Sequence, residues 1–305
     1  MPRKLIIVAE AGIDAAVAIA AALIDPNLDV LLVAGVAGVE PPEATDQCLH
    51  ALVEQIDPPR LPRYGAAPPR AAAAATGSWP KQGLGKSKLN TCGLHHPRSA
   101  EKLIAETVHQ QPGEVTVLAL GPLTTLALAF DRDRELPRML KSLILVGGVG
   151  SGPGNLGANI EFHFGCDPCA ARQVLQVETP KTLIPLEISQ SILFAPTELN
   201  TLTQGGSAAC RVLRTLLPLG IHNLAQEQGL EGLYLPDIFG VACAANPGWF
   251  KSKPVTADVE TRGELTCGMV VLDNRRVRKP PNVDWTYEAD TAAVRGYLLQ
   301  TLNGG

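Results

Sequence analysis

Residues 5–16 read LIIVAEAGIDAA, and this stretch decides the fold. It opens with an apolar run typical of a buried strand, breaks at Gly12, and continues into residues 15–23, which are rich in strong helix formers. Asp14 stands where a helix N-cap is expected, so the pattern predicts a strand, a tight turn and a helix. The turn would hold Glu10 and Asp14 at the carboxyl end of the strand, where open α/β sheets bind ligands. The alternative is structural: Asp14 only caps the helix, and Glu10 is only a solvated turn residue.

The rest of the chain repeats this alternation of short apolar runs and helical segments. Strands are predicted at residues 28–34, 115–120, 142–146 and 181–186, and helices at residues 41–55, 99–110, 123–130 and 167–174. Residues 195–243 look largely helical, and residues 255–271 alternate as strands do. Alternating strands and helices indicate an α/β fold. We therefore expect a single domain over residues 1–305, with a mostly parallel, doubly wound sheet and a helical C-terminal portion.

Composition narrows the class of protein. Of 305 residues, 46% are hydrophobic and 18% are charged, which favours a sizeable core over disorder. The net charge of −4 gives no electrostatic footprint for nucleic acid or an anionic membrane. No apolar run reaches the length of a membrane span, and residues 1–4 lead straight into the predicted first strand, so we expect no signal peptide. Seven scattered cysteines fit a reducing cytoplasm better than a disulfide framework.

One segment, residues 64–97, differs in character from its surroundings. It runs from Tyr64 to Pro97 and contains two adjacent prolines, a run of five alanines and several glycines. Loops of this length are usually functional or mobile. We therefore expect that this segment is mobile or contributes a lid over the strand ends.

Two short motifs are weaker signals. Residues 152–157, GPGNLG, have the spelling G-x-G-x-x-G, but several residues separate them from the preceding strand, so a flexible loop is favoured over a dinucleotide site. Residues 166–169, CDPC, stand at a predicted helix start, as redox motifs do, yet incidental packing cysteines are favoured. Patterns for zinc hydrolysis, serine hydrolysis and Walker A nucleotide binding do not occur.

Several segments in order resemble the nucleoside hydrolases that prefer inosine and uridine. The N-terminal strand, turn and helix look like that family's D-x-D-x-G-x-D-D motif. The later segments are residues 118–127 (LALGPLTTLA), 145–148 (LVGG), 154–168 (GN…EFH…DP) and 259–269 (VETRGELTCGM). The order and spacing hold over nearly the whole chain. This family hydrolyses the N-glycosidic bond of ribonucleosides and binds calcium at the carboxyl edge of the sheet.

The resemblance assigns roles to individual positions. It implies that Glu10 is a calcium ligand and the base for the attacking water, and that Asp14 grips the ribose. The carbonyl of Leu120 and the carboxylate of Asp237 would complete the calcium site, and Asp237 would also touch the ribose. The remaining implied ribose contacts are Asn155, Glu161 and His163.

The sequence departs from the family pattern at several of these positions. Val8 and Ala15 replace the first and fourth aspartates of the motif, and Ala15 stands where the main bidentate calcium ligand is expected. The family's usual residues are also replaced at Val39, His163 and Pro236. Calcium wants six to eight oxygens with carboxylates among them, so we predict no tightly held calcium.

Two functions therefore stay open. The first is hydrolysis of a ribonucleoside or a related N-riboside, with Glu10 and Asp14 as the catalytic pair. The second is a non-catalytic homologue that binds a ribose-like ligand or acts as a structural partner. The resemblance also implies a homodimer or homotetramer.

Overall fold

A computed structural model describes residues 1–69, 83–84, 87, 89 and 97–304. Its centre is an eight-stranded sheet in the order β3-β2-β1-β4-β5-β6-β12-β9. All neighbouring strands are parallel except β9, which runs antiparallel to β12 at one edge. The strands are β1 (Arg3–Ala9), β2 (Leu28–Gly35), β3 (Arg63–Gly65), β4 (Thr116–Leu120), β5 (Ser142–Val146), β6 (Lys181–Ile184), β9 (Phe250–Val255) and β12 (Val283–Ala289).

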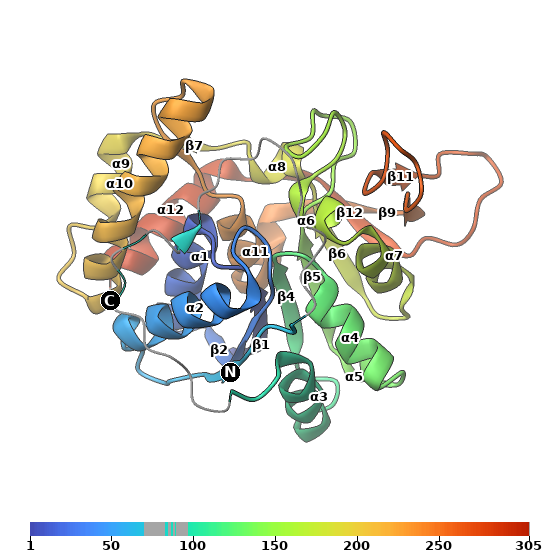
Figure 1. Cartoon of the computed structure of the whole chain (residues 1–305), viewed down its shortest axis with the longest axis horizontal. Helices are drawn as coiled ribbons and strands as arrows, with labels where there is room; N and C mark the ends of the chain where they lie inside the picture. The colour runs from blue at the N-terminus through green and yellow to red at the C-terminus, as the bar shows by residue number, and fades with distance from the viewer. Residues whose placement is uncertain (70–82, 85–86, 88, 90–96, 305) are drawn as a thin grey trace.

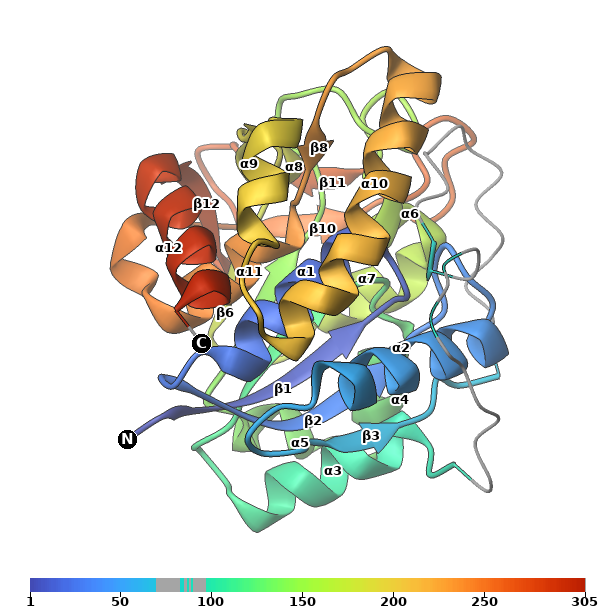
Figure 2. The same ribbon diagram turned by 90° about the vertical axis from the view of Figure 1, so that its left-hand side faces the viewer.

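Helices cover both faces of this sheet (Figures 1 and 2). One face carries α1 (Ile13–Ile24), α2 (Pro42–Ile56), α9 (Pro196–Leu202), α10 (Ala208–Gln228), α11 (Asp237–Ala245) and α12 (Thr291–Asn303). The other face carries α3 (Ala100–Gln110), α4 (Thr124–Arg132), α5 (Leu136–Met139) and α7 (Pro168–Gln176). The short helices α6 (Phe162–Cys166) and α8 (Leu186–Ser189) follow β5 and β6. The predicted mostly parallel, doubly wound α/β architecture is confirmed.

β1 shows why this sequence builds two cores. Successive side chains on a strand point to opposite faces of the sheet. Leu5 and Ile7 therefore pack with α1 and α11, whereas Ile6 and Val8 pack with the helices of the other face. All four side chains are fully buried. A strand apolar on both faces is the pattern expected for the centre of a parallel sheet.

The order of the strands reverses at β1. The chain runs outward from β1 through β2 to β3, and then returns to place β4 on the other side of β1. In open α/β sheets, ligands bind outside the carboxyl ends of the strands at such a reversal. The residues that follow β1, β2 and β4 therefore stand where a ligand site is expected.

One local expectation is corrected. Asp14 does not cap α1: the cap position is Gly12 in an extended conformation, and Asp14 lies in the first helical turn. The helical C-terminal portion is confirmed in α9, α10, α11 and α12, and β9 and β12 extend the sheet there. It also contains the two-stranded antiparallel pair of β10 (Ala257–Val259) and β11 (Val270–Leu272). A second short antiparallel pair joins β7 (Leu193–Phe194) and β8 (Leu233–Tyr234).

The predicted lid segment is only partly described. Tyr64 belongs to β3, and Gly83 and Leu84 pair back to the turn after β1, with the Leu84 N–H donating to the Ala11 carbonyl at 2.8 Å. Residues 70–82, 85–86, 88 and 90–96 lie outside the described part of the chain, so the lid stays a prediction.

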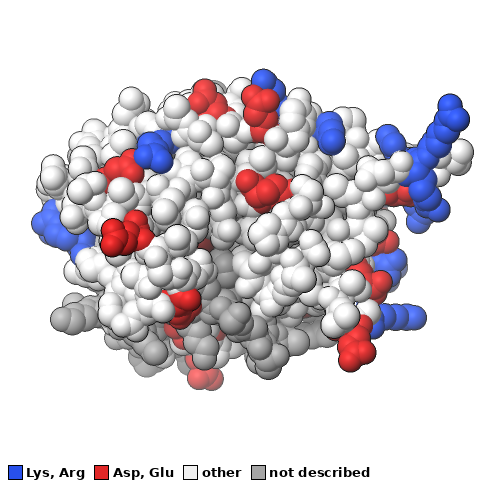
Figure 3. Space-filling view, turned by 90° about the horizontal axis from the view of Figure 1, so that it is seen from above, with Lys and Arg blue, Asp and Glu red and all other residues white. Residues whose placement is uncertain are grey.

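On the face seen from above, most of the visible Lys and Arg side chains lie near the edge of the molecule (Figure 3). The loop between β11 and β12 projects at one end in Figure 1, and it holds the exposed cations Arg275, Arg276, Arg278 and Lys279. In the described ranges, we find no helix that combines the length and apolarity needed to cross a membrane.

Candidate active site

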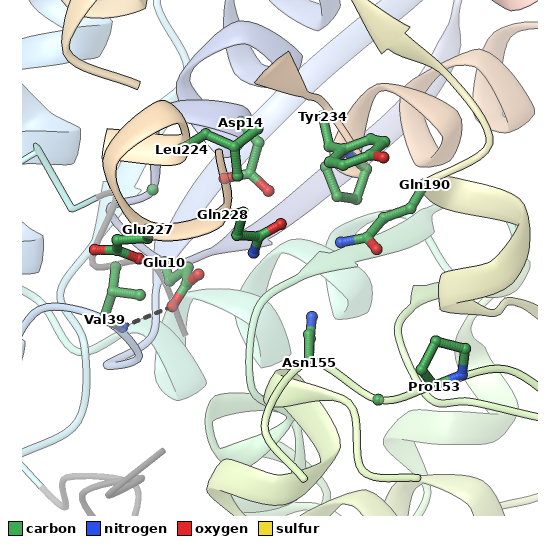
Figure 4. A pocket seen from close by; sticks show the side chains of 13 residues that line it. Glu10, Asp14, Val39, Pro153, Asn155, Gln190, Leu224, Glu227, Gln228 and Tyr234 are labelled. Carbon is green, nitrogen blue, oxygen red and sulfur yellow. Dashed lines mark hydrogen bonds between the residues drawn. The ribbon is translucent and has the colours of Figure 1, made fainter. Parts of the chain in front are cut away.

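Glu10 is held tightly at the reversal point of the sheet. It directly follows β1, is only 4% exposed, and its Oε2 accepts a hydrogen bond from the Val39 N–H at 2.8 Å (Figure 4). Its own N–H donates to the Leu120 carbonyl at 3.3 Å. Gly38 leaves room for the carboxylate, because a Cβ at this position would lie 1.7 Å from Glu10 Oε2. The ends of β1, β2 and β4 thus fix the position of one carboxylate.

Asp14 and Asp237 come together beside Glu10 from the first turns of α1 and α11. Burial, and then the neighbouring Glu10 carboxylate, raise the pKa of Asp14 to about 6. Burial, and then Asp14, raise the pKa of Asp237 well above its usual range. Asp237 is only 1% exposed, and among the described residues neither of its carboxylate oxygens has a hydrogen-bond partner. Buried polar atoms are normally paired, so an unpaired carboxylate in a native protein calls for a functional explanation.

Glu161 is anchored by the backbone around it. It caps α6, accepting hydrogen bonds from the N–H groups of His163 at 3.0 Å and Phe164 at 3.3 Å. Its Oε2 also accepts from the Gly148 N–H at 2.9 Å, just beyond β5. These bonds fix the start of α6 against the end of β5, and they orient the residue that follows the cap.

His163 lies buried among the carboxylates. Its Nδ1 lies 3.0 Å from the Val146 carbonyl, which can only accept, so Nδ1 is the donor. This leaves Nε2 facing Glu10 Oε1 at 3.7 Å. Burial alone would lower the pKa of the imidazole, but the carboxylates of Glu161 and Glu10 hold it well above its usual value. The site therefore contains, beside Glu10, an imidazole whose pKa is raised by the surrounding carboxylates.

Asn155 contributes an amide from the loop after β5. Its Oδ1 accepts a hydrogen bond from the Phe162 N–H at 2.7 Å, which fixes the side chain. With Oδ1 engaged, the amide nitrogen faces the cavity (Figure 4). The loop, residues 150–159, forms turns without a helix, which agrees with the loop interpretation of the GPGNLG motif.

A cavity of about 460 Å³ opens above these residues. Glu10, Asp14 and Asn155 line its inner part, whereas Glu161 and His163 line a smaller adjoining cavity. Pro236 lines both cavities, and the buried carboxylate of Asp237, the next residue, lies beside this lining next to Asp14. The outer part is lined by residues that the sequence did not single out: Val39, Pro153, Gln190, Leu224, Glu227, Gln228 and Tyr234. They come from loops, α10 and β8, and no local sequence pattern marks them as neighbours.

These donors do not fit a calcium ion. Ala15 is fully buried and offers no carboxylate, and one lone pair each of the Leu120 carbonyl and of Glu10 Oε2 is engaged by the N–H groups of Glu10 and Val39. Throughout the described ranges, no set of three or more His, Cys, Asp or Glu side chains is arranged to hold a metal ion. Calcium takes six to eight oxygen ligands, and the His163 imidazole, which offers no oxygen, lies beside Glu10 at 3.7 Å.

The two cysteines of the CDPC motif do not form a redox pair in this structure. Cys166 is buried and Cys169 is exposed, and both are free. Asp167 caps α7 by accepting a hydrogen bond from the Ala170 N–H at 3.0 Å, and Pro168 occupies the first helical position. The motif is thus accounted for by the start of a helix.

Comparison with known proteins identifies the family. Residues 5–296 match the model of the inosine-uridine preferring nucleoside hydrolases. A non-specific ribonucleoside hydrolase, RihC, from Escherichia coli is 32% identical over 300 residues, which cover 95% of each chain. A plant nucleoside hydrolase, PpNRh1, superposes with a TM-score of 0.87 at 23% identity and covers 100% of both chains. A purine-preferring ribonucleoside hydrolase from Gardnerella vaginalis also superposes with a TM-score of 0.87, at 20% identity over 99% of this chain and 98% of its own. The chain therefore belongs to the inosine-uridine preferring nucleoside hydrolase family.

Proposed function

We propose that this protein hydrolyses the N-glycosidic bond of a ribonucleoside or a related N-riboside in the cavity above Glu10. The single observation that carries this proposal is Asp237, whose two buried carboxylate oxygens lack partners among the described residues. Leaving a buried polar group unpaired costs about 1–3 kcal/mol, and more when it is charged. Family membership and these two unpaired acceptor oxygens favour a hydrolase over a non-catalytic homologue.

The proposed roles are supported by the positions of these side chains around the cavity. Asp14 and Asp237 accept hydrogen bonds from ribose hydroxyls, and the Asn155 amide donates one. Glu161 and His163 line the deeper cavity and contact the far side of the sugar. Charge-assisted hydrogen bonds of this kind are roughly twice as strong as neutral ones. They also place negative charge beside the sugar, where positive charge develops as the base departs.

Glu10 acts on the water. Its Oε2 is fixed by Val39, whereas Oε1 faces His163 and the cavity. A carboxylate fixed in this way orients a water molecule toward the anomeric carbon and takes its proton. Fixing the two reactants relative to each other supplies much of the rate enhancement in such reactions.

We also propose that this chemistry runs without a tightly held calcium ion. His163 lies within the carboxylate cluster beside Glu10, the residue that orients the water, and provides positive charge there. The departure of Ala15 from the family pattern removes a bidentate carboxylate, and the fully buried alanine is accommodated by the core. Homodimer or homotetramer formation and a cytoplasmic location remain further proposals, which sedimentation analysis and cell fractionation would test.

The experiment is a free-ribose assay with inosine and uridine. Asp237→Asn should lower kcat/KM by about 100-fold or more, because it replaces an acceptor pair with a side chain that accepts at one oxygen only. The matched control is Asp284→Asn, at an exposed position on β12 far from the cavity, which should keep full activity. Full activity in Asp237→Asn, or no ribose release by the unmodified protein from any riboside, would contradict the proposal.

A further inference from the structure

The outer part of the cavity has a chemistry of its own. Glu227 and Gln228 reach it from the last turn of α10, and Tyr234 and Gln190 face them from the other side (Figure 4). If the ribose occupies the inner part, then the base attached to it lies in this outer part. These four side chains therefore contact the base rather than the sugar.

The lining of the whole cavity is acidic. It contains the carboxylates of Glu10, Asp14 and Glu227, and its described lining includes no Lys, Arg or His. Glu227 is exposed, and within the described part of the chain it forms no ion pair. A cleft lined by charges of one sign focuses the electric field and concentrates ligands of the opposite sign.

Tyr234 and the side-chain amides of Gln190 and Gln228 have the chemistry needed to bind a cationic ring. The half-buried Tyr234 ring borders the cavity, and the face of a tyrosine attracts a cation within about 6 Å of its centre. Gln190 and Gln228 each offer a carbonyl acceptor and an N–H donor, which can meet an amide or amino substituent on the base. The carboxylate of Glu227 then lies on the same side of the cavity as Gln228.

A cationic base also simplifies the chemistry. A neutral base leaves as an anion unless an acid protonates it, whereas a base with a positively charged ring nitrogen leaves as a neutral molecule. Water attacks the anomeric carbon, the bond from this carbon to the ring nitrogen breaks, and the electron pair of that bond neutralises the ring. Glu10 takes the proton from the water and later releases it to solvent, so the products are ribose, the neutral base and one proton.

We infer that this protein prefers N-ribosides whose base carries a positive charge, and that Glu227 is the residue that sets this preference. The inference rests on the proposed function for the placement of the ribose. Beyond that function, the positive charge of the base is the property that is recognised, and Glu227 is the side chain that recognises it.

The test compares two probes that share one ring. Nicotinamide riboside carries a pyridinium cation with a carboxamide substituent, whereas nicotinic acid riboside carries a carboxylate in place of this carboxamide and has no net charge. We expect the unmodified protein to favour nicotinamide riboside by about 10-fold or more in kcat/KM, with the preference shrinking as salt is added. Glu227→Gln should reduce this ratio by about 3- to 10-fold. Glu231→Gln, which removes the same charge at an exposed position outside the cavity lining, should leave the ratio unchanged.

Calorimetric titration separates the two proposals. The dissociation constants of the two ribosides should differ in the same direction as kcat/KM, and this comparison does not depend on hydrolysis. Equal values for the two ribosides, no binding of either, or an unchanged ratio in Glu227→Gln would overturn the inference. Release of ribose from inosine and uridine without any charge preference would leave the proposed function standing. Loss of all ribose release would remove that function, while the binding ratio would still report on Glu227.

Discussion

Asp14→Asn should make the protein more stable and much less active. Burial and the Glu10 carboxylate raise the pKa of Asp14 from 3.8 to about 6. Ionising this group in the folded state therefore costs free energy, and a shift of this size corresponds to roughly 3 kcal/mol. Because Asp14 borders an open cavity, solvent lowers the cost to about 1–2 kcal/mol. Asparagine has nearly the same shape and cannot ionise, so it removes this cost.

The sign of the pH dependence follows from the raised pKa. The folded protein binds the Asp14 proton more tightly than the unfolded chain does, so this contribution to stability is fully present below about pH 4 and is lost as the pH rises through about 6. The stability gained by Asp14→Asn should therefore be near zero at about pH 4 and reach its full value above about pH 6. The pKa of Asp273 is instead lowered to about 2 by Arg275, so Asp273→Asn should be destabilising at neutral pH.

Urea unfolding at several pH values measures the effect through the midpoint and the slope of the transition. Ribose release should fall by about 100-fold in the same variant, because Asp14 no longer accepts two hydrogen bonds as a carboxylate. A gain in stability that does not change with pH would mean that the pKa of Asp14 is not raised. A loss of stability at neutral pH would refute the reasoning altogether.

Three further predictions test the site. Gly38→Ala should lower kcat by about 100-fold, because the new Cβ displaces Glu10. Gly206→Ala is the control, since its new Cβ would have no heavy atom within 4 Å, and it should behave as the unmodified protein. Equal activity of both variants in the ribose assay would contradict the role of Gly38. The value of kcat/KM should decline below about pH 6, where Asp14 gains a proton, and Asp14→Asn should lack this decline. Calorimetry should show no tight calcium binding by the unmodified protein, whereas Ala15→Asp should bind calcium and gain thermal stability from it; tight binding without the substitution would show that calcium belongs to the site.

The central sheet was predictable because its strands are apolar on both faces. β1, β2, β4, β5 and β6 each lie at or within a few residues of the predicted ranges. β9 was not predicted, because its side chains are mostly exposed and polar, and it lies at the antiparallel edge of the sheet. Edge strands of this kind lack both the continuous apolar run and the regular alternation on which such predictions depend.

The inner site was predictable only in part. Glu10 and Asp14 follow from the position of a turn after a central strand, whereas Asp237 is more than two hundred residues away and came from the family resemblance. The prediction of Asp14 as a cap was wrong because α1 begins two residues earlier, at Ile13 after the extended Gly12. The outer wall was missed, since the residues at the end of α10 meet those of β8 only through tertiary packing.

Val8 and Ala15 stand where the family motif has aspartates, and this affects the whole carboxylate cluster. Both side chains are fully buried in the two cores, so these positions now add apolar contacts instead of negative charges. Asp14 and Asp237 still lie together, and without a dication their repulsion must be offset in another way. The raised pKa values of these two aspartates and the imidazole of His163 beside Glu10 provide that offset, by holding protons and by supplying positive charge. A bound ribose would then meet a cluster whose internal repulsion is already partly offset, and its hydroxyls would supply the missing hydrogen bonds of Asp237.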